Sequence, residues 1–176
     1  TFELEMIFEL KNIIWFFGLI FIQIFFIDAL DFGTYSSFFS PIIITFFILK
    51  QRLNTTVFQL LIAAFFLGLI TDVFRNTLGL NTSILLIITF LKPTFLYAIS
   101  SKEDIEKDVD LNIFNLGVFR FLLFFSISIF TYHLLFFILE QFSFHNFLTL
   151  LFRALINTFS ALLFLVFLQY MFIYKK

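Results

Sequence analysis

The chain has 176 residues, of which 61% are hydrophobic and 13% are charged, and its mean hydropathy is +1.07. Soluble domains are typically about 45–50% apolar and about 25% charged, and small domains bury only about two-thirds of their surface. The composition therefore excludes a water-soluble globular domain and predicts an all-α integral membrane protein. The absence of cysteine excludes disulfides and thiolate metal sites, and the net charge of −1 argues against a nucleic-acid partner.

Six apolar segments follow one another, and a helix needs about 20 such residues to cross the hydrocarbon of a bilayer. We expect one transmembrane domain over residues 1–176, with helices at about 12–30, 35–49, 55–74, 80–99, 113–139 and 147–173. Residues 100–112 are expected to form a charged cytoplasmic loop. The second segment is short. Pro41 is expected in its first turn, where the missing N–H costs nothing, and a thin helix, a tilted span and a re-entrant element all stay open.

The basic residues predict the orientation, because cytoplasmic loops are enriched in Lys and Arg. With six crossings and both termini in the cytoplasm, only Arg75 and Arg153 face outward. Nine basic residues then lie on the cytoplasmic side: Lys11, Lys50, Arg52, Lys92, Lys102, Lys107, Arg120, Lys175 and Lys176. A second segment that did not cross would turn much of this charge outward. The sequence therefore predicts a six-helix bundle with cytoplasmic N- and C-termini.

Asp72 is one of very few carboxylates that touch an apolar segment, and ionisable residues within a membrane are candidates for function. It lies near the outer end of the third segment, three residues before Arg75. Arg153 begins the last segment on the same side. We expect Asp72 to pair with Arg75 or Arg153, or to cap the turn. A contact with a partner and a proton or solute site are the less favoured alternatives.

Other polar side chains within the segments favour structural roles. Arg153, Asn157 and Ser160 share one helix face, and such a stripe usually forms hydrogen bonds to neighbouring helices. His133 is expected to be a packed polar contact rather than a ligand. We expect the Lys92 side chain to extend toward the membrane interface.

The sequence has no pattern that predicts catalysis. It has no phosphate-binding loop, no HExxH motif and no base placed near a serine nucleophile. We therefore expect no enzyme activity, no metal and no cofactor.

The turn between the third and fourth segments contains Gly68-Leu69-Ile70-Thr71-Asp72, followed by Leu78-Gly79. It resembles the G-L-x-x-D and L-G pattern of the MreD family of bacterial rod-shape proteins. Pro41 before a short second helix and the six-segment layout add to the resemblance. Gly68, Asp72 and Gly79 are the residues that match the pattern.

The resemblance implies a non-enzymatic scaffold in the bacterial cytoplasmic (inner) membrane, surrounded by membrane lipids. Such a scaffold would bind MreC and support peptidoglycan synthesis and cell-shape control. It would connect indirectly to MreB, to RodA and to the penicillin-binding transpeptidase partner of RodA. The family fold is similar to that of the substrate-binding subunits of energy-coupling-factor vitamin transporters, so a solute-binding subunit is the alternative. The first segment lacks the AxxxA docking pattern of those subunits.

Overall fold

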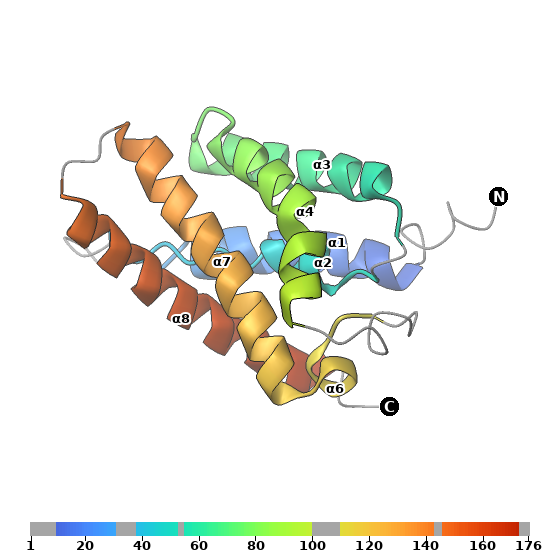
Figure 1. The fold of residues 1–176 in the computed structure, drawn as a ribbon. Coiled ribbons are helices and arrows are strands. Elements are labelled where there is room, and N and C mark those ends of the chain that lie inside the picture. The colour runs from blue at the N-terminus through green and yellow to red at the C-terminus, as the bar shows by residue number, and fades with distance from the viewer. Residues whose placement is uncertain (1–9, 31–37, 53–54, 100–109, 143–145, 173–176) are drawn as a thin grey trace.

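The computed structural model describes residues 10–30, 38–52, 55–99, 110–142 and 146–172, and these residues form helices and turns without a strand (Figure 1). Five of the helical stretches are long and apolar enough to cross a membrane. The elements are α1 (Leu10–Ile22) with the π-helical η1 (Gln23–Ile27), α2 (Thr45–Lys50), α3 (Val57–Arg75), α4 (Leu80–Ile99), α6 (Ile113–Leu116), α7 (Val118–Gln141) and α8 (Phe147–Phe172).

The bundle is built from two helical hairpins. Helix α3 packs against α4, α7 packs against α8, and α4 joins the two pairs by packing against α7. Figure 1 shows the green α3–α4 pair beside the orange and red α7–α8 pair, with α1 behind them. Helix α2 contacts α1, α3 and α4, and its residues are all buried.

Contacts between helix ends define two ends of the bundle. At the first, which we call the Asn12 end, the Lys50 side chain donates to Asn12 Oδ1 at 3.0 Å, and the rings of Trp15 and Phe172 lie 5.9 Å apart. At the second, which we call the Asp28 end, Asp28 after η1 pairs with Arg75 at the end of α3. Helix α1 therefore begins, and α8 ends, at the same end of the bundle.

The expected helix over 35–49 is wrong in its first part. Residues 35–37 lie outside the described residues, and the helix that follows begins only at Thr45, so Pro41 does not lie in its first turn. The reason is visible in the backbone. The amides of Ile42 and Ile43 donate to side chains of other helices rather than within a helical turn of their own. Every residue from Pro41 to Gln51 is buried.

Most other bounds agree closely with the predicted segments, with two differences. The first helix passes into a π-helical turn at Gln23. The predicted segment 113–139 is divided at Gly117, whose φ of +79° ends α6 before α7 begins. Residues 100–109 of the predicted charged loop lie outside the described residues, as do the C-terminal lysines.

The expectation for Lys92 is also wrong. Its side chain does not reach the interface but is buried within the bundle, with 1% of its surface exposed. Its Nζ donates to the carbonyl oxygens of Ile48 at 3.1 Å and Gln51 at 2.6 Å. These carbonyls lie at the C-terminal end of α2, where a helix leaves acceptors unsatisfied and where a lysine is favourable.

Candidate functional site

Polar side chains from three helices hold the non-helical backbone between Ser40 and Ile43. The amide of Ser40 donates to Asn157 Oδ1 of α8 at 2.6 Å, and that of Ile43 donates to Gln23 Oε1 of η1 at 2.8 Å. Gln23 also donates to the Pro41 carbonyl at 3.1 Å. Buried backbone groups outside a helix need such partners, since an unsatisfied one costs about 1–3 kcal/mol.

The third partner, His133 of α7, has a defined tautomer. The amide of Ile42 donates to His133 Nε2 at 3.2 Å, so Nε2 is an acceptor and Nδ1 carries the proton. Nδ1 then donates to the Ile129 carbonyl at 2.9 Å. The interpretation of His133 as a packed polar contact agrees with these bonds. Asn157 bonds to the non-helical segment before α2 rather than to a neighbouring helix, and the Ser160 hydroxyl bonds within α8.

The two carboxylate oxygens of Asp72 cap the first turn of α4. One oxygen accepts from the Thr77 hydroxyl at 2.5 Å and from the amide and side chain of Asn81, both at 2.9 Å. The other accepts from the amide of Thr82 at 2.9 Å and its hydroxyl at 2.6 Å. The first amides of a helix lack partners within it, and a negative charge there is favourable. Of the alternatives for Asp72, these contacts are those of a cap.

The two glycines of the turn have separate physical reasons. A Cβ on Gly68 would lie 2.3 Å from the Cα of Thr82, so only glycine allows α3 and α4 to approach this closely. Gly79 has a φ of +86°, which a side chain disfavours. With Asp72 they close the α3–α4 hairpin. The Tyr132 hydroxyl extends this network to α7, since it donates to Asn81 Oδ1 at 2.5 Å.

Arg75 and Arg153 have acidic partners other than Asp72. Arg75 donates from Nε to Asp28 at 2.8 Å and makes a second bond to the same carboxylate from a terminal nitrogen. Arg153 lies 3.5 Å from Glu140, and its guanidinium carbon lies 4.2 Å from the ring centroid of Phe137. Each arginine therefore joins two elements: Arg75 joins α3 to the residue after η1, and Arg153 joins α8 to α7.

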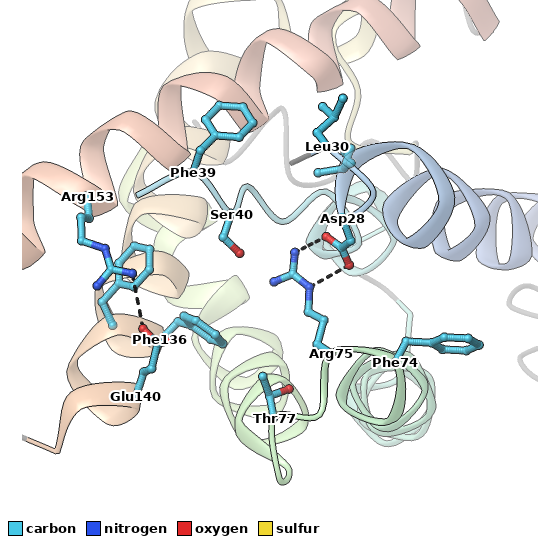
Figure 2. A pocket seen from close by; sticks show the side chains of 12 residues that line it. Asp28, Leu30, Phe39, Ser40, Phe74, Arg75, Thr77, Phe136, Glu140 and Arg153 are labelled. Atoms are coloured by element: carbon cyan, nitrogen blue, oxygen red, sulfur yellow. Dashed lines mark hydrogen bonds and ion pairs between the residues drawn. The ribbon is translucent and has the colours of Figure 1, made fainter. Parts of the chain in front are cut away.

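These two ion pairs lie on opposite sides of a cavity of about 390 Å³ at the Asp28 end (Figure 2). Ser40 supplies a hydroxyl to its wall, whereas the hydroxyl of Thr77, which also lines the cavity, donates to Asp72. The apolar part of the wall comprises Ile27, Leu30, Phe39, Phe74, Phe136 and Phe137. The cavity is the candidate binding site. The turn between α3 and α4, which Asp72 caps, contributes Thr77 to its wall.

The charged side chains that line the cavity are engaged with one another. No group of three or more metal-ligating side chains is found within the described residues. The two cations that line the cavity are engaged with carboxylates, and His133 is engaged with backbone groups at both ring nitrogens.

Sequence reasoning missed Asp28, Glu140 and Gln23. Asp28 and Glu140 follow apolar runs directly, on the side of the membrane that the sequence predicts for Arg75 and Arg153, and this shared side was a signal that could have found them. Gln23 interrupts the first apolar segment, where a polar side chain predicts a partner within the protein.

Comparison with known proteins finds no match: no protein-family model, no curated protein and no solved structure matches this chain.

Proposed function

We propose that this chain is a six-pass, non-enzymatic subunit of the MreD type, which binds MreC in the bacterial cytoplasmic membrane and supports peptidoglycan synthesis during cell elongation. The observation that carries the proposal is the α3–α4 hairpin. Gly68, Asp72 and Gly79, the residues of the family-like pattern, each have a separate physical task in closing one turn. A chance match to a short pattern would not be expected to join three such tasks in one structural unit.

The path of the second segment supports six crossings. Ser40 contacts Asn157 and lines the cavity at the Asp28 end, whereas Lys50 contacts Asn12 at the opposite end. Residues 39–43 lie outside a helix, and these five residues, if fully extended, would span with the helical residues 44–50 at most about 27 Å, close to the roughly 30 Å of bilayer hydrocarbon. A partly non-helical crossing is tolerated only where protein surrounds it, and residues 41–51 are all buried.

The distribution of charge supports a cytoplasmic Asn12 end. Lys11 and Arg52 lie there, both paired with Asp110, and Lys50 lies beside Asn12. The Asp28 end holds Arg75 and Arg153, whose charges are offset by Asp28 and Glu140. Cytoplasmic enrichment in Lys and Arg then favours the Asp28 end as the outer face.

The test is co-purification with MreC. The chain and MreC are co-expressed, extracted in a mild detergent and purified through a tag on MreC; we expect the chain to co-elute in a fixed ratio. An unrelated single-span protein of similar hydropathy, carrying the same tag, is the control and should not retain it. Absence from the MreC eluate at normal expression would overturn the proposal.

A solute-binding subunit is the second candidate, and the cavity at the Asp28 end is the observation that favours it. Its ion pairs and the Ser40 hydroxyl could orient a small polar solute between the helix ends. A small molecule of defined mass, released on denaturing the purified chain, together with no binding of MreC, would select this function.

A further inference from the structure

The cavity at the Asp28 end combines fixed charges of both signs with an apolar wall. Asp28 and Glu140 supply two negative charges, and Arg75 and Arg153 supply two positive ones, so the described lining residues sum to zero. A neutral lining with separated charges favours a ligand that is itself neutral overall and carries both charges. A simple anion would gain from the arginines but meet the carboxylates at the same time.

The Arg75 side of the cavity is suited to a phosphate group. Asp28 holds Arg75 through Nε and one terminal nitrogen, and Figure 2 shows the remaining terminal nitrogen facing the cavity. The Ser40 hydroxyl points into the same space, and the amide of Ser40 is fixed by Asn157. A guanidinium and a hydroxyl that converge in this way can both donate to phosphate oxygens.

The Glu140 side is suited to a primary ammonium group. Among the described residues, the Glu140 carboxylate pairs with Arg153 at 3.5 Å, and 43% of its side-chain surface is exposed. A carboxylate has about four acceptor positions, so it can accept from an ammonium while it keeps that contact. The two sides face each other across the cavity, with Ser40 between them (Figure 2).

The depth and the edge of the cavity point to a lipid rather than to a free solute. Arg75 ends α3 and Glu140 lies one residue before the end of α7, while Arg153 lies about 9 Å along α8 from its first residue. This is the depth of headgroups relative to spanning helices. Leu30 and Phe74, on the cavity wall, are exposed beside it, where acyl chains could continue.

We propose that this cavity binds a phospholipid with a phosphoethanolamine headgroup, with the phosphate at Arg75 and Ser40 and the ammonium at Glu140. A phosphoglycerol headgroup supplies the phosphate but no cation for Glu140. A phosphocholine headgroup supplies a cation without N–H donors. The order of binding is therefore phosphoethanolamine, then phosphocholine, then phosphoglycerol lipids. The proposal does not rest on the binding of MreC, and its test uses the purified chain with lipids and no other protein.

The experiment measures lipid retention. The chain, stripped of lipid in mild detergent, is incubated with equal amounts of the three lipids with matched acyl chains, and bound lipid is counted by native mass spectrometry. We expect phosphoethanolamine lipid to be retained most. Equal retention of the three lipids, or preference for phosphoglycerol lipid, would overturn the proposal. A competition assay compares soluble glycerophosphoethanolamine with free phosphoethanolamine lipid in displacing the bound lipid. Displacement by both at the same concentration would also overturn the proposal, because the site would then be one for a solute.

Two variants test the assigned contacts. Glu140→Gln keeps the shape but removes the charge, and it should lower the preference for phosphoethanolamine over phosphoglycerol lipid by roughly three- to fivefold, as for one partly exposed ion pair. Ser40→Ala should weaken retention of both lipids together. Ser160→Ala is the control, because the Ser160 hydroxyl donates to the Ile156 carbonyl within α8, and its lipid retention should match that of the wild type. Unchanged selectivity in Glu140→Gln would contradict the ammonium assignment.

Discussion

At the scale of single residues, Asp72 shows what a sequence can and cannot reveal. Its place in an apolar segment was enough to mark it as structural or functional, and capping was one of the alternatives. Its partners were not predictable, since Asn81 and Thr82 reach the carboxylate only because Gly79 turns the chain back and Gly68 lets α4 approach. Arg75, three residues after Asp72, was an expected partner of Asp72, but it pairs instead with Asp28 from a distant segment.

Asp72→Ala should destabilise the protein by about 2–3 kcal/mol, because it removes the acceptor of two orphan helix amides and two hydroxyls. Asp72→Asn keeps one carbonyl oxygen and should lose about half as much. Thermal unfolding in mild detergent, followed through the single tryptophan, gives the measurement. Ser83→Ala is the control, because the exposed Ser83 hydroxyl donates to the carbonyl of Gly79, four residues earlier, and not to Asp72. Unfolding of Asp72→Ala at the wild-type temperature would contradict the capping role.

Gly68→Ala should cost about 1–3 kcal/mol, since the new methyl group would overlap the Thr82 backbone and force α3 and α4 apart. Gly18→Ala is a matched control within α1, where a Cβ meets nothing within 4 Å. That control should unfold at the wild-type temperature or above it, because alanine favours a helix. The same unfolding assay compares the two, and equal stability of both variants would argue against close packing at Gly68.

At the scale of elements, the long helices were predictable and the second segment was not. The segments over 80–99 and 147–173 carry enough apolar residues to fix type and bounds. The second segment was equally apolar but too short to decide among a thin helix, a tilted span and a re-entrant element. Its non-helical part is stabilised by Gln23, His133 and Asn157, which lie far away in sequence. The helix propensity of the segment itself cannot predict hydrogen bonds to such distant residues.

Gln23→Leu should loosen this element more than it loosens the rest of the bundle. The substitution leaves the Ile43 amide and the Pro41 carbonyl without their partner, at a cost of about 2–3 kcal/mol. Hydrogen exchange read by mass spectrometry should therefore rise in peptides that cover residues 39–48. Thr131→Ala, which removes a hydroxyl bonded within its own helix, should leave exchange there unchanged. Wild-type exchange in Gln23→Leu would show that the segment does not depend on this side chain.

At the scale of the whole molecule, composition predicts the membrane character, whereas the proposed number of crossings rests on the contacts between helix ends. Five helices are long enough to span, and an odd number of spans would place the two termini on opposite sides. The contact between Trp15 and Phe172 instead brings the start of α1 and the end of α8 to one end. Charge counting over the sequence favoured the same arrangement, although four of its lysines lie outside the described residues.

Single cysteines test the orientation directly, because the chain has none of its own. Leu78→Cys and Phe142→Cys place thiols on exposed turns at the Asp28 end, where the side chains are 97% and 87% exposed. A maleimide that cannot cross membranes should label both in intact cells. Lys11→Cys and Met171→Cys should react only after permeabilisation. Labelling of Met171→Cys but not Lys11→Cys in intact cells would mean an odd number of crossings.

The burial of Lys92 makes it a natural reporter of conformational opening. Amine-reactive reagents modify lysines that solvent reaches, so Lys11, whose side chain is 56% exposed, should react readily. Lys92 should stay unmodified while its Nζ remains bonded to the carbonyls of Ile48 and Gln51. The rate at which it acquires a label, read by peptide mapping, would measure how often α2 separates from α4. The labelling rate of Lys92 in the unaltered sequence would therefore report on the motion of α2.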